Sequence, residues 1–298
     1  MGAVTFCTLL LLKNKQEKSG GRERLASRGV AALKKSSFAR GAGGYSGRMK
    51  MWIFRLWMLA LACGLMAADA FAQAPIRDYS KSEFIIVSGG PALRKWEDLR
   101  RPQEQHDRWW GNFVRAARIR IQQIRRAHGD AARITWLVYR PAYEQRVPED
   151  AARNADQPAA MSKIESVRDA YNLKMVYFNT GGDLIRHINS RPRGSIVNFE
   201  YFGHSNRDCW MFDYSAEISG ASVAFLHEKQ LGQIRRSVFD KKAFCKSWGC
   251  HTGESMSKFW KRAVGIPLIG AEGKTDYSVI IDHKTLPTLS GRPARWTQ

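Results

Sequence analysis

Two reactive side chains follow two strand-like stretches of this sequence. His204 comes directly after the apolar stretch 195–203, and Cys250 comes directly after the stretch 243–249. A thiol attacks a carbonyl as its thiolate, and a neighbouring imidazole can take the thiol proton. If the fold brings the two side chains together, they can serve as nucleophile and base.

The elements around these two residues alternate between strands and helices. The sequence predicts strands at 84–88, 134–140, 175–179, 195–203, 243–249 and 266–272, and helices at 110–128, 161–173, 182–190, 226–239 and 255–264. A loop with three prolines is predicted at 141–160, and a hairpin is indicated near 211–225. Strands and helices at this spacing predict an α/β fold, with a mostly parallel sheet and helices on both faces.

The expected sheet also predicts where the two reactive residues lie. In an open parallel sheet, active sites form beyond the carboxyl ends of the strands. If the strands before His204 and Cys250 are neighbours joined by one crossover, the two residues emerge side by side, because adjacent strands are about 5 Å apart. A helix begins shortly after Cys250, so nearby backbone N–H groups can favour a thiolate and stabilise an oxyanion.

The order of these features resembles the clan CD cysteine peptidases, the caspase-like group of caspases, gingipains, legumains, separases and CHAT domains. A strand and a His are followed, after one helix, by a strand, a small residue, Cys-x-x-Gly and a further helix. His204 and Cys250 are 46 residues apart, and the interval in caspases is about 50 residues. The resemblance covers most of residues 83–285 and implies a caspase-like three-layer sandwich. Papain-like folds, in contrast, place the Cys before the His.

The resemblance also implies roles for individual residues. Cys250 would be the nucleophile and His204 the base, while Ser205, Gly249 and His251 would line the site and the oxyanion hole. The family usually has Gly where this chain has Ser205, and no caspase pentapeptide is present. His251, next to the nucleophile, is an alternative base.

Acidic residues stand in loops expected to border the site. Asp208, Asp213, Glu272 and Asp276 could select a basic side chain of a substrate. The alternative for each is a solvated loop carboxylate.

Three cysteines follow residue 72, an odd number that leaves at least one thiol unpaired within the monomer. Cys245 lies inside a predicted strand and is expected in the core. Cys209 could instead form a disulfide with Cys250, which would leave an inactive scaffold. The histidines and cysteines show no HxxxH or CxxC pairing, so neither a metal site nor a cofactor is predicted.

The start of the chain is not expected to belong to the folded domain. Residues 1–48 are basic and lack sustained apolar periodicity, which indicates a disordered extension or an early start codon. Residues 49–72 have the layout of a signal peptide cleaved after Ala72. A lipid anchor on Cys63 or an uncleaved anchor are the alternatives. The mature chain, 73–298, is then a single secreted or periplasmic domain with no membrane span.

Charge narrows the choice of partners. The formal net charge is +21, of which residues 73–298, with 36 basic and 24 acidic residues, keep +12. A basic surface attracts polyanions, but nucleic acid is not the default partner of a secreted protein. The sequence therefore predicts a secreted cysteine endopeptidase acting on a peptide or protein. The alternative is a non-catalytic binding module on the same fold that holds an anionic partner.

Overall fold

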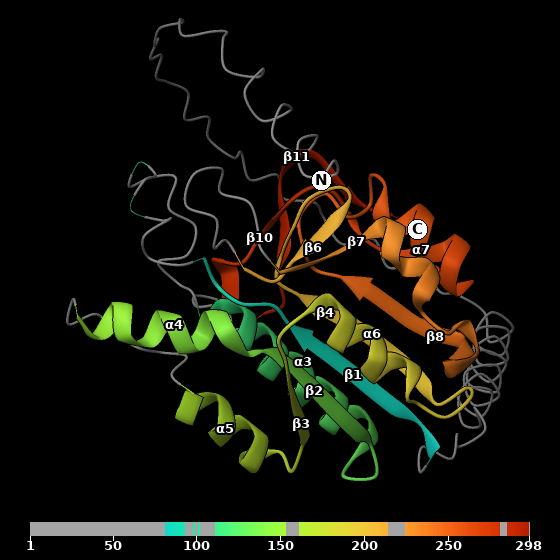
Figure 1. The fold of residues 1–298 in the computed structure, drawn as a ribbon, viewed down its shortest axis with the longest axis horizontal. Helices are drawn as coiled ribbons and strands as arrows, with labels where there is room; N and C mark the ends of the chain where they lie inside the picture. Colours follow the sequence, from blue (N-terminus) through green and yellow to red (C-terminus); the bar gives the residue numbers. More distant parts are fainter. Residues whose placement is uncertain are drawn as a thin grey trace, which may run out of the picture. The chain divides into compact units, whose positions relative to one another are not determined.

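A six-stranded sheet forms the centre of the computed structural model, which describes residues 81–92, 98, 101, 111–152, 161–213, 224–280 and 285–297. The predictions for residues 1–72 lie outside these ranges. Every neighbouring pair in the sheet is parallel. In sheet order the strands are β3 (Lys174–Phe178), β2 (Arg133–Tyr139), β1 (Glu83–Ser88), β4 (Ile196–Phe202), β8 (Phe239–Ser247) and β9 (Leu268–Ile269) (Figure 1).

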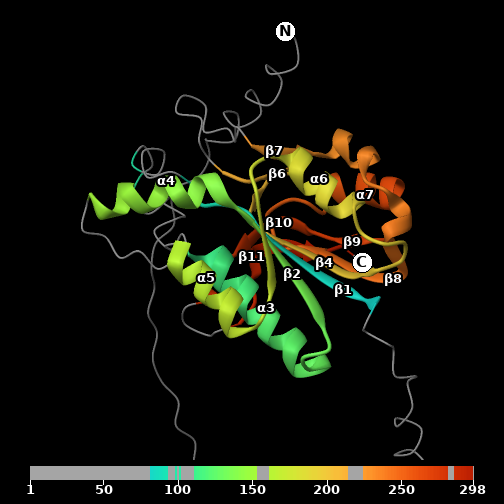
Figure 2. The same ribbon diagram turned by 60° about the horizontal axis from the view of Figure 1, so that its bottom comes forward.

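Helices cover both faces of this sheet, as predicted (Figure 2). On one face lie α3 (Asn112–His128) and α5 (Met161–Ala170), and on the other lie α6 (Gly181–Asn189) and α7 (Met256–Val264). Alternate residues of β1 point to opposite faces. Phe84 and Ile86 pack in the core under α3 and α5, while Ile85 and Val87 pack in the core under α6 and α7. The α/β three-layer sandwich is therefore confirmed.

The strand order places a switch in direction beside β1. Counted along the chain, the six parallel strands have the order 3-2-1-4-5-6, which is common in doubly wound sheets. After β1 the chain adds β2 and then β3 on one side of β1. It then returns and adds β4 on the other side of β1. The predicted site therefore belongs to the second half of the sheet, between β4 and β8.

The predicted loop at 141–160 is wrong for its first part, because α4 spans Arg140–Ala151. Pro141 stands in the first turn, where a helix tolerates proline. The buried Tyr143 donates its hydroxyl to the carbonyl of Gly89 at 2.8 Å, and the fully buried Arg146 bonds to the carbonyl of Ala92. Tertiary packing thus stabilises a helix that the prolines argued against. Residues 153–160 lie outside the described ranges.

The predicted helix at 226–239 is also wrong. The chain forms strand β7 (Phe225–His227) and two short 3-10 helices, η4 (Glu228–Gln233) and η5 (Arg236–Val238), before β8 begins at Phe239. Ile234 and Arg235 between them are extended, with ψ of 124° and 105°. A continuous α-helix cannot pass through two extended residues.

Two small antiparallel sheets complete the described fold. One contains β5 (His204–Ser205), β6 (Cys209–Met211) and β7, and its β6–β7 pair confirms the hairpin expected near 211–225. The other pairs β10 (Ala271–Asp276) with β11 (Thr288–Trp296). The strand predicted at 266–272 is therefore split between β9 in the main sheet and β10 outside it. Within the described ranges, no helix has the length and apolar character needed to cross a bilayer.

Candidate active site

The strands that precede His204 and Cys250 are direct neighbours. β4 and β8 pair in parallel, with Tyr201 opposite Ser247, and the N–H of Trp248 donates to the carbonyl of Tyr201 at 2.8 Å. Both reactive residues therefore follow the carboxyl ends of adjacent strands, as the crossover argument predicted.

At the switch point itself, between β1 and β4, backbone hydrogen bonds tie the turn after β1 to its neighbours. Gly89 donates its N–H to the carbonyl of Phe202 at 2.8 Å, and Gly90 donates to the carbonyl of Phe212 at 2.6 Å. A Cβ at Gly90 would lie 2.5 Å from the Cβ of Ala142. Ligands of doubly wound sheets commonly enter at the switch point, and here the turn leaves no room for a side chain at Gly90. The β4 and β8 ends are one strand away.

The loops after β4 and β8 touch each other closely. The hydroxyl of Ser205 donates to the carbonyl of Cys250 at 2.7 Å. A Cβ at Gly249 would lie 2.1 Å from the hydroxyl oxygen of Ser205, so only glycine fits at this contact. Ser205 and Gly249, which the resemblance placed in the site, thus hold the two loops together.

The sulfur of Cys250 faces a residue that the sequence analysis did not single out. It lies 3.4 Å from both the backbone nitrogen and the hydroxyl oxygen of Thr275, on β10. Cys250 is half-buried, and its thiol is free. Cys209 and Cys245 are buried and form no disulfide, so the disulfide between Cys209 and Cys250 is not formed.

The imidazole of His204 packs in a row of aromatic rings. Its ring meets Phe113 of α3 edge-on, with centroids 4.8 Å apart, and Phe113 meets Tyr277 in the same way at 4.9 Å. Tyr277 lies two residues after Thr275, and its hydroxyl donates to the carbonyl of Trp248 at 3.2 Å. Phe113 and Tyr277 therefore connect the surroundings of His204 with the loop that carries Cys250.

Tyr277 is held as a neutral hydroxyl. Burial raises the pKa of Tyr277 well above its usual value, and negative charge on Cys250 raises it further. A backbone hydrogen bond from Gly203 acts in the opposite direction and is the weaker influence. Tyr277 thus keeps its hydroxyl proton, which it donates to the carbonyl of Trp248, throughout the physiological pH range.

Trp248, which precedes the Gly249–Cys250 turn, is fixed by the core. Its indole N–H donates to the buried carboxylate of Glu200 at 2.8 Å, and Glu200 also pairs with Arg120 at 2.5 Å. The ammonium of Lys246 lies 3.6 Å from the centre of the Trp248 ring, and burial lowers the pKa of Lys246 to about 8. A buried carboxylate, whose charge is compensated by an ion pair, therefore holds the start of the Cys250 loop in place.

His251, the alternative base, has a different environment. Its Nδ1 lies 2.6 Å from the carboxylate of Glu254, and its backbone has a left-handed φ of 61°. Glu254 also accepts the N–H of Gly273 at 3.2 Å. A carboxylate beside an imidazole fixes the orientation of the ring. His251 is therefore oriented by Glu254.

The predicted substrate-binding acids all have local partners. Asp208 pairs with its neighbour Arg207 at 3.2 Å, and Glu272 pairs with Arg295 at 2.5 Å. Asp276 accepts both the N–H and the hydroxyl of Ser278.

Asp213 does not fit the expectation of a solvated loop acid. Its side chain is buried and accepts the hydroxyl of Tyr139 at 2.7 Å. The same contact and burial raise the pKa of Tyr139. Asp213 is thus bound within the core.

Sequence reasoning missed Thr275, Tyr277 and Phe113. The first two lie just beyond the strand predicted at 266–272, and the sequence indicated no role for them. Phe113 belongs to the apolar stripe of α3 and looked like an ordinary core residue. No local pattern indicated that these residues meet Cys250 and His204.

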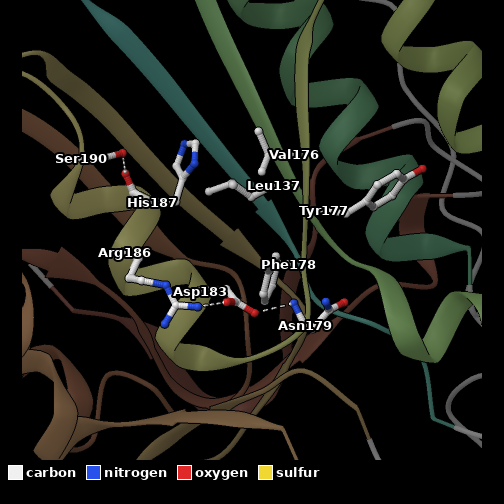
Figure 3. A pocket seen from close by; sticks show the side chains of 9 residues that line it. All are labelled: Leu137, Val176, Tyr177, Phe178, Asn179, Asp183, Arg186, His187 and Ser190. Atoms are coloured by element: carbon white, nitrogen blue, oxygen red, sulfur yellow. Dashed lines mark hydrogen bonds and ion pairs between the residues drawn. The ribbon is translucent and has the colours of Figure 1, made fainter.

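The hollow drawn in Figure 3 lies elsewhere, between β3 and α6, and has a volume of about 400 Å³. None of the predicted site residues lines it. Its carboxylate, Asp183, is already engaged by the N–H groups of Asn179 and Thr180 and by Arg186. These bonds form the amino-terminal cap of α6, so they have a structural role.

Among the described residues, no three His, Cys, Asp or Glu side chains are grouped so as to hold a metal ion. Comparisons of the chain with family models, with curated proteins and with solved structures found no match.

Proposed function

We propose that this protein is a caspase-like cysteine endopeptidase that acts on peptides or proteins outside the cytoplasm. The observation that carries the proposal is the position of Cys250 and His204 after the carboxyl ends of two adjacent parallel strands. The hydroxyl of Ser205, next to His204, donates to the carbonyl of Cys250. In the proposal, Cys250 is the nucleophile and His204 is the base, and the support is that both follow adjacent strands at one edge of the sheet.

The proposed reaction follows acyl-transfer chemistry. His204 takes the thiol proton of Cys250 as the sulfur forms a bond to the scissile carbonyl carbon, and backbone N–H groups near Ser205 and Cys250 stabilise the oxyanion that results. His204 gives a proton to the leaving amine as the C–N bond breaks. It then takes a proton from water, which attacks the thioester and releases the acid product and the free thiol. In the proposal, three carboxylates border this edge of the sheet and favour basic substrates: Asp208, Glu272 and Asp276.

The test is a pair of single substitutions in the full chain. Cys250→Ala is expected to lower the cleavage of denatured casein at least about 1,000-fold, and His204→Ala about 100- to 10,000-fold. Cys209→Ala is the matched control, because it removes a buried thiol outside the proposed chemistry. A peptidyl acyloxymethyl ketone ending in arginine should label Cys250 in the wild type and should label nothing in Cys250→Ala. Casein cleavage that survives Cys250→Ala would contradict the proposal, as would wild-type protein that neither cleaves casein nor takes the label.

A second candidate function is a non-catalytic module that holds an anionic partner. Basic side chains gather where β4 and β8 begin, at the opposite end of the sheet from Cys250. The turn before β4 contacts η5 through Gly194 N–H and Ser237 O at 2.8 Å, and Gly265 after α7 lies against Arg236. Seven exposed cations on these segments form no ion pair among the described residues: Arg193, Arg235, Arg236, Lys241, Lys242, Lys261 and Arg262.

Salt-dependent binding distinguishes this second function. The double variant Arg235→Glu/Lys242→Glu should elute from a sulfated polysaccharide column at clearly lower salt than the wild type, because fewer counterions are released on binding. Arg118→Glu/Arg126→Glu on the exposed face of α3 makes the same change in charge and serves as the control. Equal shifts for both pairs would indicate a general charge effect and would contradict a dedicated surface. Cys250→Ala should leave elution unchanged.

A further inference from the structure

We propose that Thr275 is a positioning residue that holds the sulfur of Cys250 and stabilises its thiolate. The inference rests on the proposed function, because it deepens the role of Cys250 in that reaction. It assigns to the β10–β11 hairpin a part in the site that neither the sequence pattern nor the resemblance provided.

The first argument is the contact itself. The backbone nitrogen and the hydroxyl oxygen of Thr275 both lie 3.4 Å from the sulfur, and the Thr275 carbonyl oxygen lies 4.0 Å from it. One residue thus presents three polar atoms to the sulfur, of which the carbonyl oxygen is the most distant and can only accept a hydrogen bond from the neutral thiol. The N–H can only donate, whereas the hydroxyl can donate to a thiolate or accept from a thiol. Donors aimed at a group favour its charged, accepting form.

The second argument is the register between the Cys250 loop and β10. The N–H of His251 donates to the carbonyl of Gly273 at 2.7 Å, and the N–H of Gly253 donates to the carbonyl of Ala271 at 2.9 Å. The two bonds run in antiparallel sense, since the loop residue advances by two as the β10 residue falls back by two. The same register places Thr275 opposite Gly249, so the N–H of Thr275 arrives beside the turn that carries Cys250. In a regular antiparallel ladder this N–H would donate to a backbone carbonyl. Here it donates to the sulfur instead.

The third argument is that Cys250 is held from two directions. Its carbonyl accepts the hydroxyl of Ser205 on β5, and its sulfur meets Thr275 on β10. The hairpin that carries Thr275 is itself fastened by the Glu272–Arg295 ion pair and by the pairing of Thr275 with Leu289. Two separate segments therefore fix the main chain and the side chain of the nucleophile, and such preorganisation is what a reactive group needs.

The experiment measures the thiol directly. Full-length protein is treated with iodoacetamide between pH 5 and 10, and the modification of Cys250 is followed by peptide mapping. Thr275→Val keeps the shape but removes the hydroxyl, and Thr275→Ser keeps the hydroxyl. In Thr275→Val the pH of half-maximal alkylation should rise by about 0.5 to 1 unit, because a hydrogen bond to a charged group is lost. Thr275→Ser should stay close to the wild type.

Controls keep the result specific. Thr288→Val, at the exposed start of β11 opposite Asp276, makes the same chemical change on the same hairpin and should not move the profile. Near-ultraviolet circular dichroism checks folding, and Thr275→Ala replaces Thr275→Val if the valine variant does not fold. A wild-type profile in Thr275→Val, or an equal shift in Thr288→Val, would overturn the inference.

The inference can fail separately from the proposed function. A shifted alkylation profile in a protein that cleaves no peptide would support the role of Thr275 and contradict the peptidase. An unshifted profile in an active peptidase would contradict the role of Thr275 and would support the peptidase. If both hold, Thr275→Val should lower kcat more than it raises KM, and Thr275→Ser should restore kcat.

Discussion

The polar side chains at the two ends of the central sheet differ in their burial and in their partners. At the amino end, the carboxylate of Glu83 is buried at the start of β1, accepts the hydroxyl of Thr135 at 2.5 Å and pairs with Arg191 at 3.3 Å. At the carboxyl end, His204 on β5 and Cys250 in the turn after β8 are only half-buried. The amino end thus holds its carboxylate in an ion pair inside the core, whereas the carboxyl end combines a buried carboxylate, Asp213, with reactive groups within reach of solvent.

His187 of α6 shows how the amino end handles a titratable group. Burial, and to a smaller extent the positive charge of Arg191, lower the pKa of His187 to about 4 against the weaker opposing influence of Glu83. The imidazole is therefore neutral at physiological pH. The comparison teaches that the titratable groups at the amino end, the buried Glu83 and the half-buried His187, interact with one another and with Arg191, while the half-buried residues beyond the strand ends are the candidates for chemistry.

The largest effect that would test this difference comes from removing the buried carboxylate. Glu83→Ala leaves Arg191 and Thr135 without their partner, so the free energy of unfolding should fall by about 3 to 5 kcal/mol. In Glu83→Gln, which keeps an acceptor for Thr135, the free energy of unfolding should fall less. Urea denaturation measures both. The pH profile of Cys250 alkylation should stay unchanged wherever the variants remain folded, and a changed profile would break the separation between the two ends.

A smaller effect is expected where the two site loops touch. Gly249→Ala places a Cβ 2.1 Å from the hydroxyl oxygen of Ser205, so the free energy of unfolding should fall by about 1 to 3 kcal/mol. Unlike Glu83→Ala, this variant should also slow the alkylation of Cys250, because the contact that holds its carbonyl is displaced. Gly232→Ala, which meets nothing within 4 Å, is the control. Normal alkylation in folded Gly249→Ala would argue that the Ser205 contact does not position Cys250.

The smallest effect is the pH dependence that His187 contributes. Because the pKa of this group is about 4 in the folded state and near 6.5 in the unfolded chain, the unfolded state binds the extra proton between these values. Stability should therefore fall as pH decreases from about 6.5 to 4, by at most about 1.4 kcal/mol per pH unit before solvent screening reduces it. Urea midpoints at pH 7.5, 5.5 and 4.5 should show a shallower decline in His187→Gln. Identical slopes in both proteins would show that His187 is not held neutral by the fold.

Much of the architecture could be predicted because its signals are local. The apolar stripe of α3 and the continuous apolar runs of β1 and β4 are periodic patterns that the sequence displays directly. The errors arose where packing overrode local preference. Tyr143 and Arg146 stabilise α4 despite its prolines, and extended residues at 234 and 235 interrupt the helix predicted there.

The sequence by itself determined the order of strands and helices and the placement of His204 and Cys250 after two of those strands. It could do so because strand and helix periodicity, and the rule that active sites lie beyond strand ends, need only short stretches of chain. Only the tertiary structure decided that Thr275 meets the Cys250 sulfur, and that Phe113 and Tyr277 lie around the same edge. Those contacts join residues 25 to 164 positions apart, and they depend on the path of the β10–β11 hairpin and on the helix that covers the sheet.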